Sequence, residues 1–484
     1  MTSTTSTQKP GVQAPTAPNA PAAPAMPSRP VIAGLLLGIV LATLDGTVVG
    51  TALPVIVEDL GGLTHLSWVV TAYLLTTAVT TPLWGKIGDL YGRKGSYLVS
   101  ISVFLAGSAL CGLAQDMGQL IAFRALQGIG AGGLFVGALS LIGTLLPPAE
   151  AGRSQSVIGV LLPAAMIGGP LVGGFLTDRL DWRWVFYVNL PVGAVALAVV
   201  GLGVRVRTER VRARMDLAGA GLLTAAILAL TLLASWAGTT YAWVSPPIAA
   251  LGVVAGAALV AFLRVERRAA EPVIPPRLFR DRNFTAAQGL TFLAGAAMLA
   301  AASYLPQYMQ LVLGMSSTAS GLLLLPLMLG MMGAQLTIGR RVSAGGRYRP
   351  YPIAGGALAT AGALALLLLG TGTPPWAASA LTLMLGVGLG CQLQPAMLIT
   401  LSSAEPRDIG AASGTQTLLR TVGGSLGVAV LGSVFAGKVG AAVTPAGVVA
   451  GVHGVALGTA VLCALGFGVA WLVRDGDVTP AARR

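Results

Sequence analysis

The sequence predicts an all-α membrane protein that crosses the bilayer many times, and three observations support this. Hydrophobic residues make up 55% of the 484-residue chain, charged residues make up only 10%, and the mean hydropathy is +0.79. A soluble domain carries roughly 25% charged residues. Apolar runs of about 20 residues, the length that spans a bilayer as a helix, recur along the whole chain. The sequence lacks the alternating pattern of an outer-membrane β-barrel.

Fourteen spans are expected, as two sets of six with a pair between them. The first six are expected at about 31–53, 66–84, 96–115, 119–146, 155–177 and 184–203. The inserted pair is expected at about 216–236 and 246–263. The last six are expected at about 284–312, 318–339, 352–370, 375–400, 408–435 and 451–473.

The distribution of Lys and Arg sets the expected orientation, because cytoplasmic loops carry an excess of positive charge. With the N-terminus placed inside, only Arg179, Arg183 and Lys438 of the 30 basic residues fall in outer loops, and only Arg124 and Arg420 fall within spans. We therefore expect a multi-pass protein of the cytoplasmic (inner) membrane with both termini in the cytoplasm. The net charge of +13 is then a topology signal and indicates no nucleic-acid partner.

Five regions follow from this arrangement. They are a disordered cytoplasmic tail (1–30), an N-terminal six-helix bundle (31–203), an inserted helix pair with basic cytoplasmic flanks (204–283), a C-terminal six-helix bundle (284–473) and a cytoplasmic tail (474–484). The stretch GKIGDLYGRK at 85–94 has a faint echo in GRRVSAGGRY at 339–348. Duplicated halves around a central substrate site are an architecture of secondary transporters.

Several kinds of site are missing from the sequence. It contains no GxxxxGK[ST] and no HExxH, and its three cysteines lie far apart inside apolar runs. It also offers no convergent nucleophile, base and oxyanion donors. We therefore expect no catalytic residues, no metal and no cofactor, which leaves a proton gradient as the energy source for any transport.

Asp45 is the acid that falls clearly within an expected span, in the stretch LATLDGTVVG at 41–50. A charge at mid-membrane costs at least about 2.5–3.5 kcal/mol on insertion scales. A carboxyl group in such a place can change protonation near physiological pH, as a proton carrier requires. The alternative is a structural carboxylate that a neighbouring helix holds in place.

Arg124 is the natural partner of Asp45. Asp45 is expected about 12 Å from the outer end of the first span, and Arg124 about 8 Å from the outer end of the fourth, at 1.5 Å per residue. The two depths agree within one helical turn, so protonation of Asp45 is able to switch the pair. A permanent structural ion pair is the alternative reading.

Two glycine-rich motifs suggest conformational roles. In GKIGDLYGRK, the glycines Gly85, Gly88 and Gly92 allow a tight reversal, and Asp89 and Arg93 offer charges that pair and separate when domains rock. A plain positively charged turn is the alternative.

The fifth span carries GGPLVGG at 168–174, which combines a proline kink with flat faces that pack closely. Here bare helix packing is the alternative. The motif's residues of interest are Gly169, Pro170, Gly173 and Gly174.

Polar side chains within the spans are candidates for lining a substrate cavity, although helix–helix hydrogen bonding and interfacial anchoring explain each of them equally well. They are Gln127, Asn189, Gln288, Tyr304, Gln307, Tyr308, Gln335, Gln392, Gln394 and Arg420.

Taken together, these stretches resemble the major facilitator superfamily, and specifically its drug:proton antiporters with fourteen spans. LDGTVVGTALP at 44–54 resembles the first-span motif of that subfamily, and GKIGDLYGRK resembles the superfamily's loop signature. RALQGIGAGG at 124–133 resembles the fourth-span motif, and GGPLVGG resembles the antiporter motif. WRWVFYVNLPVG at 182–193 and RTVGGSLGVAV at 420–430 are also typical of the group.

The resemblance implies two six-helix bundles, alternating access and multidrug efflux driven by proton influx. It implies that Asp45 takes part in protonation and substrate release, and that Arg124 assists proton transfer. The glycines and proline of the fifth span limit leak, and Asp89 and Arg93 latch the outward-facing state.

One departure from the group bears on the substrate. Some multidrug members that export cations carry further acids in the tenth or thirteenth span, whereas here 318–339 contains no acid and 408–435 contains none after Asp408, which speaks against dicationic substrates. We therefore expect lipophilic, monocationic or neutral drugs or antibiotics, bound by a protein that acts as a monomer. Two alternatives stay open, namely a dedicated exporter of a metabolite, lipid or amino acid, and a membrane sensor that does not transport.

Overall fold

The structure is a computed structural model that is helical throughout almost all of its described length. It describes residues 29–475 apart from 62–65, 147–156, 159–160, 162–163, 166–167, 170–171, 178, 205–215, 238–240, 270, 316, 344–346 and 440–443.

The helices of the N-terminal half form a bundle around a glycine-rich central helix. They are α1 (Arg29–Leu60), α2 (Leu66–Tyr91), α3 (Arg93–Gly112), α4 (Met117–Leu145), α6 (Trp184–Tyr187) and α7 (Asn189–Gly203). Helix α4 packs against α1, α2 and α3, and α7 packs against α1 and α3. A Cβ on Gly130 of α4 would stand 2.6 Å from the Cα of Phe104 in α3, so glycine is what lets these two backbones approach.

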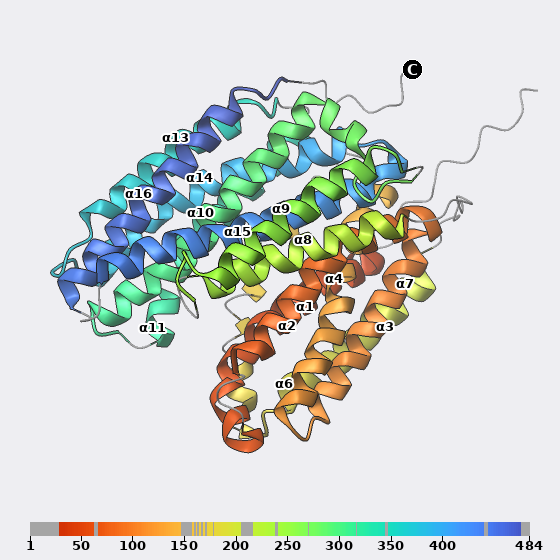
Figure 1. The fold of residues 1–484 in the computed structure, drawn as a ribbon, viewed down its shortest axis with the longest axis horizontal. Helices are drawn as coiled ribbons and strands as arrows, with labels where there is room; N and C mark the ends of the chain where they lie inside the picture. The colour runs from red at the N-terminus through yellow and green to blue at the C-terminus, as the bar shows by residue number, and fades with distance from the viewer. Residues whose placement is uncertain are drawn as a thin grey trace, which may run out of the picture.

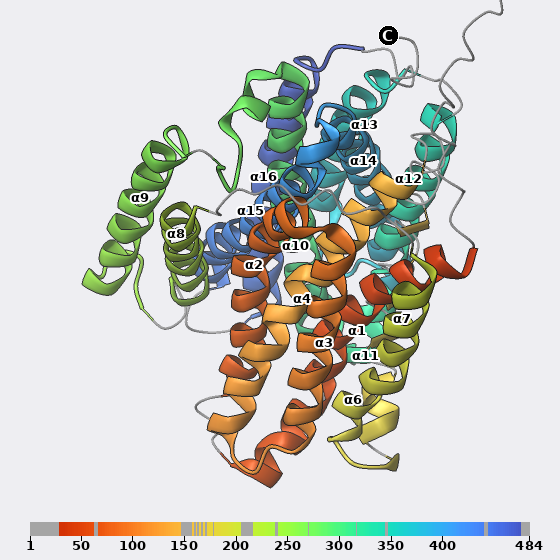
Figure 2. The ribbon, with the colours of Figure 1, turned by 90° about the vertical axis from the view of Figure 1, so that its right-hand side faces the viewer.

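The inserted pair consists of α8 (Leu217–Trp236) and α9 (Pro246–Glu266), which pack against one another. Helix α8 also contacts α2 and α15, so it spans the junction between the two halves of the chain. Figure 2 shows α9 on the outside of the molecule, with α8 between it and the bundles.

The C-terminal half forms a second bundle with a matching plan. Its elements are η2 (Pro276–Arg280), α10 (Arg282–Leu311), α11 (Ser317–Leu322), α12 (Leu325–Ser343), α13 (Pro350–Ala365), η3 (Leu366–Leu368), α14 (Pro375–Ser402), η4 (Pro406–Asp408), α15 (Ile409–Val439) and α16 (Pro445–Ala470). Helix α14 packs between α12 and α13, as α4 packs between α2 and α3. This correspondence gives structural weight to the faint sequence echo between the halves.

The two bundles meet at one end and diverge toward the other (Figure 1). The joined end is built from the last turns of α2 and α4 and the first turns of α15. A Cβ on Gly410 of α15 would stand 2.7 Å from the Asp89 carboxylate, and one on Gly414 would stand 3.1 Å from the Cα of Pro82. Small residues therefore allow α15 to lie directly on α2.

Eleven helices in the described part of the chain are long and apolar enough to cross a membrane. Helices α2 and α12, with 26 and 19 residues, match two further expected spans but are not among these eleven. The expected fifth span, 155–177, is interrupted by residues outside the described part of the chain, at 155–156, 159–160, 162–163, 166–167 and 170–171. The count of fourteen stays a prediction, as does the side of the membrane on which the termini lie.

Two local expectations need correction. The motif at 85–94 is not an open loop, because α2 continues to Tyr91 and α3 begins at Arg93; only Gly92, with φ 106°, makes the reversal. The expected span at 318–339 is interrupted between α11 and α12. Pro326 explains this break, since it has no N–H to donate to the carbonyl of Leu322.

Candidate functional site

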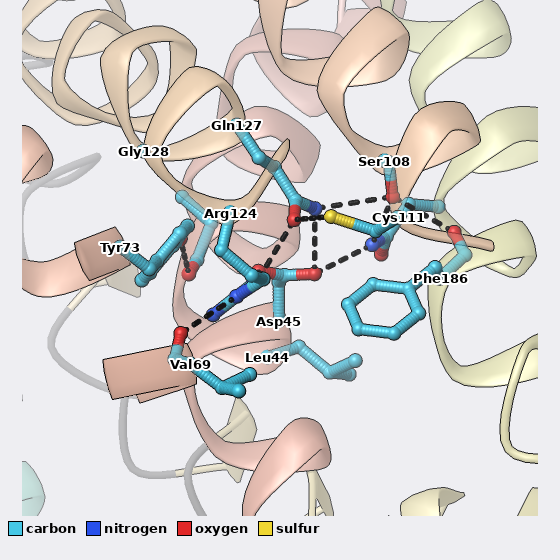
Figure 3. A network of polar contacts seen from close by, with 12 residues as sticks. Leu44, Asp45, Val69, Tyr73, Ser108, Cys111, Arg124, Gln127, Gly128 and Phe186 are labelled. Atoms are coloured by element: carbon cyan, nitrogen blue, oxygen red, sulfur yellow. Dashed lines mark hydrogen bonds and ion pairs between the residues drawn. The ribbon is translucent and has the colours of Figure 1, made fainter. Parts of the chain in front are cut away.

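Asp45 lies in the middle of the N-terminal bundle and faces Arg124. The carboxylate projects from α1 and the guanidinium from α4, and Arg124 Nη1 lies 2.6 Å from Asp45 Oδ2. Both side chains are fully buried. Figure 3 shows the two groups pointing at one another inside the bundle.

Two amide side chains complete the surroundings of the carboxylate. Gln127 Nε2 donates to Asp45 Oδ1 at 2.9 Å, and Asn189 Nδ2 donates to the same oxygen at 2.7 Å. Both amides also donate to Ser108 Oγ, at 3.1 and 3.0 Å, and Ser108 in turn donates to the carbonyl of Phe186. One buried network therefore joins α1, α3, α4 and α7.

Arg124 is held on several sides. Its Nε donates to the carbonyl of Val69 at 3.3 Å, its Nη1 also donates to Gln127 Oε1 at 2.7 Å, and its Cζ lies 4.0 Å from the centre of the Tyr73 ring. Burying an ion pair is costly, and these extra contacts supply the hydrogen bonds that such a pair needs. Within this network, two buried atoms have no hydrogen-bond partner among the described residues, namely Arg124 Nη2 and Asn189 Oδ1.

Glycines bring these polar groups together. A Cβ on Gly107 of α3 would stand 2.6 Å from the Cα of Gln127, and one on Gly128 of α4 would stand 2.5 Å from the carbonyl oxygen of Tyr73. Any side chain at either position would push α3 or α2 away from α4 and separate the network. The sequence therefore builds this site through helix contact as much as through its charged residues.

The network contains a single carboxylate, and one proton on it would cancel the negative charge that faces Arg124. Within the described residues there is no group of three His, Cys, Asp or Glu side chains that could hold a metal ion.

A second polar cluster joins the two bundles at their contact end. Asp89 accepts from Arg93 Nη2 at 2.9 Å, and it also accepts from the backbone N–H groups of Gly410 at 3.2 Å and Ala411 at 2.9 Å. The carboxylate thus caps the N-terminus of α15, where the helix dipole favours a negative charge. Arg93 also donates to Thr144. Burial raises the pKa of Asp89, and its contacts with Arg93 and the two backbone N–H groups oppose this rise.

The segment after α9 contributes two further ion pairs to this end, and we call residues 267–281 the strap. Lys86 of α2 lies 2.8 Å from Glu271, and Arg277 lies 2.8 Å from Asp408, just before α15. Sequence reasoning missed these pairs. Lys86 and Glu271 are 185 positions apart, and neither has a motif around it that points to the other.

The antiporter motif of the expected fifth span is only partly visible. Gly169 is buried, and a Cβ there would overlap the Thr47 side chain of α1. Gly173 is buried and Gly174 is half-buried. Pro170 lies outside the described residues. The close approach to α1 is the feature that the structure adds.

Most of the expected cavity residues do not share one site. Gln127 and Asn189 belong to the Asp45 network. In the C-terminal bundle, buried Gln288 donates to Thr400, and Tyr308 donates to the carbonyl of Gly370. Gln288 thus links α10 to α14, and Tyr308 links α10 to the turn that follows η3.

The remaining candidates differ in exposure. Gln392 and Gln394 are buried, each with an Nε2 that has no partner among the described residues. Tyr304 is half-buried and donates to the carbonyl of Val428. Gln307 and Gln335 are half-buried.

Arg420 of α15 stands apart from all of these. Its side chain is half-buried, and its Cζ lies 5.2 Å from the centre of the Phe135 ring in α4, across the boundary between the bundles. Among the described residues, no hydrogen bond or ion pair engages its guanidinium.

Ser108 and Tyr73 are site residues that sequence reasoning did not single out. The Tyr73 ring packs against Arg124, and Ser108 accepts from Gln127 and Asn189, the two amides that donate to Asp45. A serine and a tyrosine in apolar spans are common enough that only helix rotation, which composition does not specify, would have identified them.

Comparisons with known proteins agree with this architecture. Residues 35–428 match the family model described as Major Facilitator Superfamily. An uncharacterized MFS-type transporter of Mycobacterium tuberculosis is 40% identical over 405 residues, which are 84% of this chain and 59% of that protein. The chain thus matches under two thirds of the length of that relative.

Two Bacillus subtilis proteins are matched over more of their length. Multidrug transporter protein MdtP is 36% identical over 85% of this chain and 76% of its own, and Multidrug resistance protein 3 is 37% identical over 84% and 79%. Among solved structures, the human organic anion transporter MFSD10 superposes with a TM-score of 0.65 at 17% identity, covering 91% of this chain and 99% of that one. The Escherichia coli fucose:proton symporter superposes with a TM-score of 0.60 at 14% identity, covering 92% and 98%. At these identities, the structures speak for the fold alone.

Proposed function

The chain belongs to the Major Facilitator Superfamily, whose members are membrane transporters and not enzymes, and from that premise we propose that it exports lipophilic drugs or antibiotics in exchange for protons. Two Bacillus relatives carry names that denote multidrug transport or resistance, which favours efflux over uptake. The observation that carries the proposal is the fully buried Asp45–Arg124 pair.

Asp45 is proposed as the proton carrier. In its ionised form it accepts hydrogen bonds from Arg124, Gln127 and Asn189. Protonation removes the charge that holds Arg124 and adds an O–H that needs an acceptor. Asn189 Oδ1 has no partner in the described structure, so a turn of this amide would present an acceptor to the new O–H. The network thus has two arrangements, which differ by one proton.

Proton and substrate need not touch the same atom. Exchange requires only that each of them favours a different state of the transporter, so that binding of one weakens binding of the other. Because the network joins α1, α3, α4 and α7, a change in its hydrogen bonds acts on the packing of the whole N-terminal bundle.

Asp89, Arg93 and the strap are proposed as the latch of one end state. The Asp89 cap on α15 and the pair between Lys86 and Glu271 connect parts that must separate when the bundles rock. We also propose fourteen spans with both termini in the cytoplasm, in a monomer of the cytoplasmic membrane. On that topology the joined end is cytoplasmic, and the structure corresponds to the outward-facing state.

Two observations bear on the charge of the substrate. The tenth expected span contains no acid and the thirteenth contains none after Asp408, which argues against dications. Among the described residues nothing neutralises Arg420, and this positive charge weighs against the monocations that the sequence left open.

Transport into proteoliposomes tests the proposal. Purified protein would be reconstituted with an imposed pH gradient and offered ethidium, chloramphenicol and 1-pyrenebutanoate, which are a cation, a neutral antibiotic and an anion. We expect uptake of at least one compound that requires the gradient and is lost in Asp45→Asn. Glu58→Gln, which removes an exposed acid from the same helix, is the matched control and should transport normally. Gradient-driven uptake that survives in Asp45→Asn would refute the proposed role of Asp45.

A further inference from the structure

Arg420 is a cation in the middle of a long helix. It lies well inside α15, which runs for 31 residues from Ile409 to Val439, so its side chain is too far from either helix end to reach the membrane surface. In the part of the chain that the structure describes, its guanidinium makes no hydrogen bond and no ion pair. A charged group placed inside a membrane protein at such cost marks a functional site.

The side chain of Arg420 reaches from one bundle to the other. A Cβ on Gly295 of α10 would stand 3.2 Å from Arg420 Cγ, so the stem of the arginine lies against α10. The guanidinium, at the other end of the side chain, lies over Phe135 of α4. Arg420 is further along α15 than Gly414, which is the last glycine of α15 in contact with α2. It therefore lies beyond the Gly414 contact along α15, where its guanidinium reaches α4 of the other bundle.

Among the described residues, no carboxylate pairs with Arg420. Asp45 is the acid within an expected span, and it is sealed in its own network with Arg124. Asp89 and Asp408, the acids near the start of α15, are engaged by Arg93 and Arg277. The described residues thus provide an aromatic face and an unmatched positive charge, at a place that faces both bundles.

From this arrangement we propose that Arg420 binds an anionic group of the transported compound, and that the substrates are lipophilic organic acids. The planar guanidinium matches a carboxylate or a similar oxyanion through two parallel hydrogen bonds. Phe135 supplies a face for the apolar part of the same molecule. The naming of a substrate class rests on the export function proposed above.

The proposal also fits an exchange driven by protons. Export of an anion and import of a proton both carry positive charge inward. Each cycle would therefore respond to the membrane potential as well as to the pH gradient. A monocation exchanged for one proton would move no net charge.

Equilibrium binding tests the anion site without any gradient. Protein in nanodiscs would be titrated with 1-pyrenebutanoate, its neutral amide and 4-(1-pyrenyl)butylammonium, which share one hydrocarbon body. We expect the carboxylate to bind about tenfold more tightly than the amide, as a charge-assisted hydrogen bond implies. Arg420→Gln should remove this preference and leave affinity for the amide unchanged, which also reports on folding. Arg420→Lys should keep part of it, because the charge remains and the planar fork is lost.

Arg407→Gln is the matched control, because it removes one exposed positive charge just before the same helix. It should leave all three affinities unchanged. Wild-type protein that binds the three probes equally, or prefers the ammonium compound, would overturn the proposal even if Arg420→Gln failed to fold. So would a carboxylate preference that survives in Arg420→Gln.

Failure of the anion site and failure of the export function are distinguishable. Gradient-driven transport without a carboxylate preference in binding would leave the function and refute the site. A carboxylate preference abolished by Arg420→Gln, in a protein that transports nothing under a gradient, would refute the function and leave an anion site.

Discussion

Two arginines lie within the membrane-spanning helices, and the structure treats them in opposite ways. Arg124 in the N-terminal bundle is fully buried, pairs with Asp45 at 2.6 Å and donates to Val69 and Gln127. Arg420 in the C-terminal bundle is half-buried, and its one described side-chain interaction is with the ring of Phe135.

The difference separates two tasks. An ion pair within the protein is able to act as a switch, because one proton on the carboxylate removes the negative charge that balances the arginine. A charge that the protein leaves unmatched is available to a ligand. The N-terminal bundle therefore carries the proposed proton site, and the C-terminal bundle carries the proposed anion site. The two sites are coupled because proton and substrate favour different conformational states.

The largest expected effect is the loss of the partnered arginine. Arg124→Gln leaves Asp45 as an uncompensated buried charge, which costs about 3–5 kcal/mol of stability. Arg420→Gln breaks no ion pair in the described structure and should change the free energy of unfolding by less than about 1 kcal/mol. Denaturant unfolding of the two variants in the same micelles measures both. Equal destabilisation by the two substitutions would contradict the contrast between a paired Arg124 and an unpaired Arg420 in the described structure.

The next effect comes from removing both members of the pair. Asp45→Asn combined with Arg124→Gln leaves no buried charge, so the double variant should be more stable than the sum of the single effects implies. For residues in direct contact, we expect a coupling of about 0.5–3 kcal/mol. A double-mutant cycle on unfolding free energies measures it. Strict additivity would mean that the two side chains do not interact as the structure places them.

A smaller effect is expected at the joined end. Asp89→Ala removes the cap that α2 places on α15, at a cost of about 0.5–2 kcal/mol to the joined state. Spin labels at positions 113 and 311, on the diverging ends of α3 and α10, would report the distance between the bundles. Asp116→Ala is the matched control, since Asp116 caps its own helix α4 within one bundle. If Asp89→Ala and Asp116→Ala change the distance between the spin labels equally, the Asp89 contact does not act as a latch between the bundles.

The smallest effect is expected from the strap. Glu271 is partly exposed, so its pair with Lys86 should contribute about 0–1 kcal/mol and weaken with added salt. Glu271→Gln should shift the same spin-label distance in the same direction as Asp89→Ala, but less. A shift larger than that of Asp89→Ala would move the main latch from the Asp89 cap to the strap.

The sequence predicted the class of fold and the pairing of Asp45 with Arg124, for clear physical reasons. An acid in an apolar span is visible without a structure, and helix rise alone placed Asp45 and Arg124 at similar depths. The roles of Gln127 and Asn189 were not predictable in the same way. Which face a helix turns inward depends on glycine contacts such as that of Gly107 with Gln127, and composition does not give the rotation.

The joined end shows a second limit. Gly85, Gly88 and Gly92 suggested one flexible reversal, but only Gly92 has positive φ. Gly85 serves close packing instead, since it lies against Gly410 in the other bundle. A glycine in a sequence indicates either conformational freedom or close approach, and only the tertiary contact decides between them.

The most direct test of the account counts protons. Purified protein in weakly buffered nanodiscs would be mixed with 1-pyrenebutanoate while the pH is followed. At a pH where Asp45 is protonated before the probe is added, exchange through Asp45 predicts that wild type releases up to one proton for each probe bound, because proton and substrate favour different states. It also predicts that Asp45→Asn binds the probe and releases none. Equal proton release from the two proteins, or none from wild type that binds the probe, would contradict the account.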